Sequence, residues 1–190
     1  MLKATRPART DLADAAGRVL DDVLGDHLIV LFCGINPSLY SAAAGHHFAR
    51  PGNRFWPALH LAGWTPRQLR PSEQHELPSY GVGVTNLAPR ATTAAAELSR
   101  DELVEGAAAL ALKVERTTPQ AVAFLGVTAF RSGFDDRAAV IGRQPVDLVA
   151  GVQTWVLPNP SGLNAHYQLS DLARLYGDLR VALAGAEPPG

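Results

Sequence analysis

The chain has 190 residues, of which 47% are hydrophobic and 18% charged, and its formal net charge is −1. This length fits a single domain with a sizeable core, and the composition excludes a disordered chain. The sequence has neither an apolar run of the about 20 residues that span a membrane nor a secretory signal, so we expect a cytoplasmic protein without a membrane partner. The single cysteine, Cys33, excludes an internal disulfide and a multi-cysteine zinc site.

The charges are unevenly distributed along the chain. Residues 28–72 and 148–170 contain no Asp or Glu, and the first stretch carries four arginines and three histidines. A protein with almost no net charge can still present a positive face to a polyanion such as DNA. Chance clustering explains the same pattern about equally well, so charge alone leaves the partner open.

Capping residues and hydrophobic periodicity predict helices, and short apolar runs predict buried strands. Helices are expected over residues 10–24, 54–62, 99–116 and 170–184, with a short one between Gly126 and Gly133. Strands are expected over residues 28–33, 82–87, 121–125 and 153–157. Alternating strands and helices predict an α/β fold with a mainly parallel sheet, formed by one domain over residues 1–190 with flexible tails at 1–9 and 185–190.

Two unusual loops follow predicted strands, at residues 34–53 and 158–167. Functional sites of parallel sheets form at the carboxyl ends of the strands. Asn36 comes directly after the first strand, and Pro37 restricts the backbone behind it. Asn36 therefore either closes an Asx-turn or presents a rigidly held amide at the edge of the sheet.

The first loop also contains His46, His47 and Phe48. Adjacent histidines point apart and have no cysteine or carboxylate near them in the sequence, so we expect no metal site. Phe48 is either a core residue or a platform on which a ring stacks. In the second loop, Pro158, Pro160 and Gly162 restrict a turn with Leu163 at its tip, either an ordinary exposed leucine or a wedge for base steps.

Two segments carry a specific resemblance. GINPSLYSAAAGHHFARPGNRFW at residues 34–56 and NPSGLNAHY at 159–167 resemble the mismatch-specific uracil/thymine DNA glycosylases, the second family of the uracil-DNA glycosylase superfamily. GVTNL at residues 83–87 extends the resemblance. It implies a three-layer α/β/α sandwich and a monomeric enzyme that uses no metal or cofactor. It also implies base excision repair: hydrolytic removal of uracil, and more weakly thymine or damaged pyrimidines, from double-stranded DNA opposite guanine after the base is flipped out.

The resemblance assigns roles to residues of both loops. Asn36 matches the catalytic asparagine, which orients a water molecule because an amide cannot act as a general base. The pocket for the base is expected to include Ile35, Ser38, Ser41, His47, Phe48 and Asn86. The intercalation loop is expected to comprise Asn159, Pro160, Ser161, Gly162, Leu163 and Asn164. Phosphate contacts are expected from His46, Arg50, Arg54 and His166.

The sequence departs from the family pattern at several positions. Ser38 stands where many members have glycine, Ala165 where many have arginine, and Pro89 where an acidic residue is common. Asn86 occupies a variable position, where its amide either contacts the base or closes a strand-end turn. The alternative function is a non-catalytic binder of mismatches or abasic sites, which would keep the wedge and the positive face but would not need Asn36.

Overall fold

The computed structural model describes residues 7–185, so most of the two predicted tails lies outside the described residues. The strands are β1 (Val30–Gly34), β2 (Val82–Asn86), β3 (Ala121–Leu125), β4 (Gly142–Arg143) and β5 (Gln153–Leu157). The helices are α1 (Arg9–Ala13), α2 (Leu39–Ala44), α3 (Phe55–Leu61), α4 (Arg100–Thr117), α5 (Val127–Gly133) and α6 (Leu169–Ala184). Two 3₁₀ segments, η1 (Pro71–Tyr80) and η2 (Ala95–Glu97), complete the elements.

The strands form one sheet in the order β2-β1-β3-β5-β4. The four longer strands are parallel to one another, and the short β4 is antiparallel to β5. All four were predicted from the sequence, β1 from a continuous apolar run, which is the pattern of a strand covered on both faces. The predicted α/β fold with a mainly parallel sheet is therefore confirmed.

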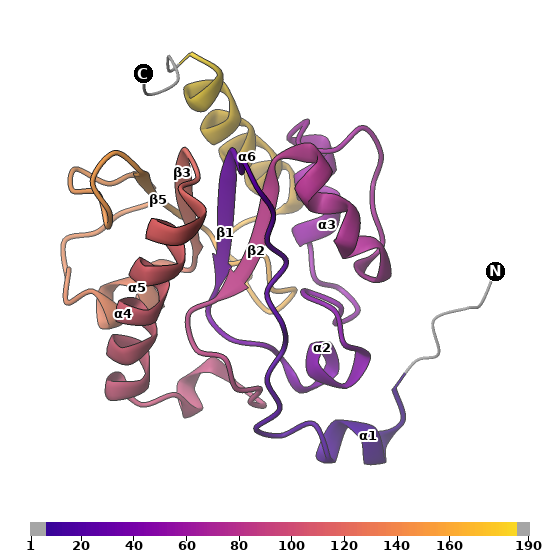
Figure 1. Cartoon of the computed structure of the whole chain (residues 1–190). Helices are drawn as coiled ribbons and strands as arrows, with labels where there is room; N and C mark the ends of the chain where they lie inside the picture. Colours follow the sequence, from indigo (N-terminus) through magenta and orange to yellow (C-terminus); the bar gives the residue numbers. More distant parts are fainter. Residues whose placement is uncertain (1–6, 186–190) are drawn as a thin grey trace.

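Helices cover both faces of the sheet and give an α/β/α sandwich (Figure 1). Helices α3 and α6 pack on one face, where Phe32 of β1 makes edge-to-face contacts with Phe55 and Trp64. Helices α4 and α5 pack on the other face, where Leu31 and Cys33 of β1 belong to the same buried cluster. Burial raises the pKa of the Cys33 thiol, which fits the core role expected for this residue.

Most predicted helix ends agree with the structure. Ser99 and Glu102 form the predicted capping box of α4, with N–H to oxygen distances of 3.2 and 2.9 Å. Helix α3 begins one residue later than predicted, with Arg54 at the N-cap, and the Asn53 side chain accepts a hydrogen bond from the Phe55 N–H. The cap of helix α6 lies two residues earlier than predicted, at Gln168 and not at Ser170, and the Asp171 carboxylate accepts from the Gln168 N–H there.

The helix predicted over residues 10–24 is wrong. Only α1 is helical, and the chain turns at Gly17, where φ is +75°. Residues 17–24, which we call the strap, then run extended along the edge of β2 (Figure 1). Val23 exchanges two 2.8 Å backbone hydrogen bonds with Val84, so pairing with the open edge of the sheet overrides helical periodicity.

Among residues 7–185, no helix is long and apolar enough to cross a membrane.

Helix α2 lies inside the segment that the sequence suggested to be a loop. Its N-cap is Ser38, whose Oγ accepts from the Ser41 N–H at 3.1 Å, and Gly45 ends it with a φ of +72°. This short helix fixes the path of the chain between Asn36 and His47.

Candidate active site

A cavity of about 260 Å³ opens at the carboxyl ends of the parallel strands. Gly34 ends β1, Asn86 ends β2, Leu125 ends β3, and Asn159 follows β5, and all four line the cavity. The cavity brings together most of the residues predicted for the site: Ile35, Asn36, Ser38, Ser41, His47, Phe48, Asn86, Arg50, Asn159, Ser161 and Leu163. Side chains that are more than 120 residues apart in sequence therefore share one pocket.

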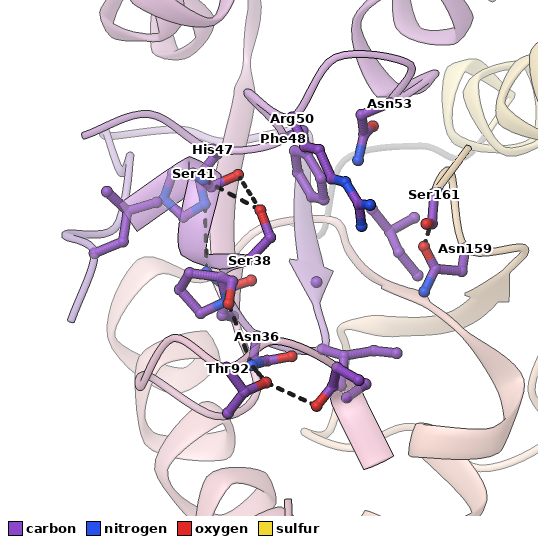
Figure 2. A pocket seen from close by; sticks show the side chains of 18 of the residues that line it. Asn36, Ser38, Ser41, His47, Phe48, Arg50, Asn53, Thr92, Asn159 and Ser161 are labelled. Atoms are coloured by element: carbon purple, nitrogen blue, oxygen red, sulfur yellow. Dashed lines mark hydrogen bonds between the residues drawn. The ribbon is translucent and has the colours of Figure 1, made fainter. Parts of the chain in front are cut away.

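The amide of Asn36 is held in one orientation by its nitrogen. Nδ2 donates to the Arg90 carbonyl at 3.1 Å and to Thr92 Oγ1 at 2.7 Å, with a longer contact to the Pro37 carbonyl. Because a backbone carbonyl only accepts hydrogen bonds, the nitrogen must be the atom on that side. Figure 2 shows the oxygen of Asn36 on the side away from Thr92, where it is available as an acceptor.

Thr92 is a polar residue of this site that the sequence analysis missed. It is buried, lines the cavity, and donates its own hydroxyl proton to the Ala94 carbonyl at 2.8 Å. A hydroxyl oriented in this way must receive the Asn36 N–H on a lone pair, which fixes both groups. No motif pointed to Thr92, because its approach to Asn36 comes from pairing between Ser38 and Thr92 across 54 residues.

Asn86 and His47 form the inner end of the cavity. His47 is only 1% exposed, and its Nε2 lies 2.9 Å from the Asp21 carbonyl of the strap. Burial lowers the pKa of His47, so the ring is neutral near pH 7, with its proton on the nitrogen that faces the carbonyl. Nδ1 is then an acceptor for Nδ2 of Asn86 at 3.4 Å.

Phe48 combines the two alternatives that the sequence left open. Its ring stacks on Phe55 of the core, with centroids 4.1 Å apart, and it also lines the cavity. Its φ of +52° is unusual for a residue other than glycine and turns the ring into this position. A Cβ on Gly34 would lie 2.6 Å from Asn86 Oδ1 and 3.3 Å from the Phe48 ring, so only glycine leaves the pocket open here.

Two further features shape the pocket wall. Ser41 is buried, and its Oγ accepts from the Ala49 N–H while it contacts Ser38 Oγ (Figure 2). Leu20 of the strap also lines the cavity, although the sequence analysis placed it in a helix. The strap is fixed behind it by Asp22, which pairs with Lys113 at 2.7 Å and accepts a hydrogen bond from Thr85.

The 158–167 loop borders the cavity on the side opposite Ser41 (Figure 2). Asn159 Oδ1 accepts from the Ser161 N–H, and Asn164 Nδ2 donates to the Asn159 carbonyl, so the loop is a compact turn. Leu163 at its tip is 76% exposed. A second hollow lies on the other side of this leucine and is lined by Asn164, His166 and other residues, so Leu163 stands between two cavities.

The four residues predicted to contact phosphate have different surroundings. Arg50 is exposed at the mouth of the cavity, and His166 lies by the second hollow. His46 lies outside the cavity lining, and burial lowers its pKa. The guanidinium of Arg54 is directed at backbone carbonyls of the 158–167 loop.

The described lining contains no carboxylate, and Arg50 is its permanent cation. Among residues 7–185 there is also no group of three His, Cys, Asp or Glu side chains that could hold a metal ion. The pocket therefore offers amides, hydroxyls, one neutral imidazole and an aromatic ring. These groups can bind a planar polar ring and orient a water molecule.

Comparison with known proteins identifies the family. Residues 22–180 match the Uracil DNA glycosylase superfamily. The chain belongs to this superfamily. The fold also resembles the solution NMR structure of a candidate uracil DNA glycosylase from Methanosarcina acetivorans, with 19% identity and a TM-score of 0.59 over 86% of this chain and 98% of that one. The superfamily match supports a general role as a DNA glycosylase, which hydrolyses N-glycosidic bonds in DNA repair.

Proposed function

We propose that this glycosylase removes uracil, and more weakly thymine or damaged pyrimidines, from mismatched double-stranded DNA, chiefly opposite guanine. The observation that carries the proposal is the orientation of Asn36. Its Nδ2 is engaged by Arg90 and Thr92, so its oxygen is left to accept a hydrogen bond at the pocket. A water molecule held there presents its own lone pair to an electrophile, which in this reaction is C1′ of the flipped nucleotide.

The remaining pocket residues suit a uracil ring. Phe48 offers a stacking face, and Asn86 offers one donor and one acceptor in the same plane, as the N3–H and a carbonyl oxygen of uracil require. The N-glycosidic bond breaks with its electron pair going to the base, which departs as the uracil anion. Water adds to C1′ of the oxocarbenium-like sugar, and the proton that it loses passes to solvent. Since no described group of the lining is placed as a general base, the rate comes from positioning and electrostatic stabilisation.

The base opposite the target in the other DNA strand provides the selection for mismatches. A base in a G·U or G·T pair costs less to unpair than one in a regular pair, so flipping favours these sites. Leu163 enters the space that the flipped nucleotide leaves, and the backbone near Gly162 and Asn164 faces the widowed guanine. Arg50 lines one of the two hollows that Leu163 borders and His166 lines the other, and both approach the DNA backbone.

The test is a single-turnover excision assay with excess protein on otherwise identical duplexes that contain G·U, G·T, A·U or G·C. We expect alkali-labile sites at uracil with G·U fastest, G·T slower, and no strand cleavage before alkali. Protein carrying Asn36→Ala, purified in parallel, controls for contaminating glycosylases. Tight binding of G·U duplexes without release of any base would refute the proposal and favour the non-catalytic binder.

A further inference from the structure

Arg54 connects the start of helix α3 to the 158–167 loop. Its Nη1 donates to the Tyr167 carbonyl at 2.5 Å, and its Nη2 donates to the carbonyls of Ser161 at 2.5 Å and Asn164 at 2.8 Å. Two of these acceptors flank Leu163 in sequence, at two positions before it and one after it. The planar guanidinium can hold three acceptors in fixed directions, whereas a lysine ammonium on a flexible stem cannot reproduce this fork.

The backbones of the two segments also interlock. The Arg54 N–H donates to the Pro160 carbonyl at 2.9 Å. A Cβ on Gly162 would lie 2.7 Å from the Gly52 carbonyl oxygen, so only glycine allows the loop to approach this closely. The base of the loop is therefore docked on residues 52–54, and these residues lead directly into the core through Phe55.

Leu163 itself gains little from packing, since 76% of it is exposed. An apolar side chain in that position keeps a defined direction only if its backbone is held. Within the described chain, hydrogen bonds among residues 159–164 close the turn that carries Leu163. The Arg54 guanidinium, at the start of helix α3, donates further hydrogen bonds to this turn.

We propose that Arg54 is a positioning residue that holds Leu163 in the direction needed to enter the base stack. This role rests on the proposed function, and it differs from the phosphate contact that the sequence suggested for Arg54. A wedge that moves freely must lose conformational entropy while the duplex is being opened, whereas a wedge held in advance does not. Arg54 thus acts on the flipping step through Leu163 and leaves the bond-breaking step at Asn36 unchanged.

The experiment is a double-mutant cycle with Arg54→Lys and Leu163→Ala. Single-turnover excision is measured on a duplex with an A·U pair and on one in which uracil faces a tetrahydrofuran abasic analogue, so that no base pair opposes flipping. We expect each single variant to lose about tenfold on A·U and less than about twofold on the unpaired uracil. The double variant should be no slower than Leu163→Ala alone, because Arg54 has no wedge left to position.

Arg180→Lys is the matched control, because Arg180 also donates to a backbone carbonyl, that of Ala62, at 3.0 Å. It should leave the ratio of the two rates unchanged. Additive losses in the cycle, or equal losses on both duplexes, would overturn the role of Arg54. Wild-type protein that excises uracil neither from these duplexes nor from one with a G·U mismatch would instead overturn the proposed function.

If Arg54→Lys does not fold, Gly162→Ala provides the second variant, since its Cβ would lie 2.7 Å from the Gly52 carbonyl oxygen and displace the loop while the Arg54 residue is retained. A loss confined to A·U would support the need for a docked loop. An unchanged rate on A·U would overturn it.

Discussion

Asn36 and Leu163 both follow a parallel strand of the same sheet, but they are held in different ways. Asn36 makes its own restraining contacts, through an amide nitrogen bonded to Arg90 and Thr92. Leu163 makes almost none, and its place depends on Arg54 and on the turn that carries it. The comparison teaches that a polar side chain can be fixed by its own hydrogen bonds, whereas an exposed apolar one must be fixed through its backbone.

Asn36→Ala tests the polar side of this comparison and should have the largest effect. Loss of the group that orients water is expected to slow excision by about 10²-fold or more. The loss should be similar on paired and unpaired uracil, since it affects a step after flipping. Duplex affinity, measured by fluorescence anisotropy, should stay within a few-fold. Single-turnover rates like those of the wild type would refute the assignment of Asn36.

Thr92→Val sharpens the comparison by keeping Asn36 and removing one of its two close restraints. The variant leaves an Asn36 N–H and the Ala94 carbonyl without their partner, which we expect to cost about tenfold in rate. The single-turnover rate constant should fall without a matching change in duplex affinity. An unchanged rate would show that the Arg90 carbonyl alone is sufficient to orient the amide.

Leu163→Ala tests the apolar side. The wedge offsets unstacking, so its loss should slow A·U excision by about tenfold, G·U excision less, and excision of unpaired uracil least. The melting temperature should barely change, because an exposed tip leaves no cavity. Equal losses on the three substrates would argue against a wedge, and a large fall in melting temperature would place Leu163 in the core.

Arg50→Gln is expected to have the smallest effect, and it concerns the surface between the two residues. Each phosphate contact contributes about −0.9 to the slope of log affinity against log salt concentration. The variant should therefore reduce the magnitude of that slope by about 0.9, the contribution of one phosphate contact. The loss of affinity should be similar for mismatched and regular duplexes. An unchanged slope would mean that Arg50 does not contact a phosphate.

The four longer strands were predictable, and LIVLFC and AVAFL show the reason most clearly, because residues that are apolar at successive positions suit a strand covered on both faces. The capping box at Ser99 and Glu102 was predictable for a similar reason, since its partners are three residues apart. The family motif placed Asn36, Asn86 and Leu163 around one site, and the structure brings all three to the same cavity.

The remaining features depend on contacts between distant segments. The strap has the apolar spacing of a helix, but its Val23 pairs with Val84, 61 residues away, and no local signal reports that β2 needs a partner. No sequence motif assigned a role to Thr92, and a phosphate contact was expected for Arg54, whereas in the fold both residues contact groups of distant segments. Hydrogen bonds to the backbone of another segment leave no pattern of side-chain types to detect.

The strap also has a consequence for association between copies of the chain. A strand at the edge of a sheet offers free N–H and C=O groups to any other strand, which is a route to aggregation. The strap occupies those groups of Val84, and the short antiparallel β4 covers β5 on the opposite side of the sheet. A proteolytic cut that released the strap would therefore remove Leu20 from the pocket wall. It would also leave β2 as an unpaired edge strand that can pair with a strand of another chain.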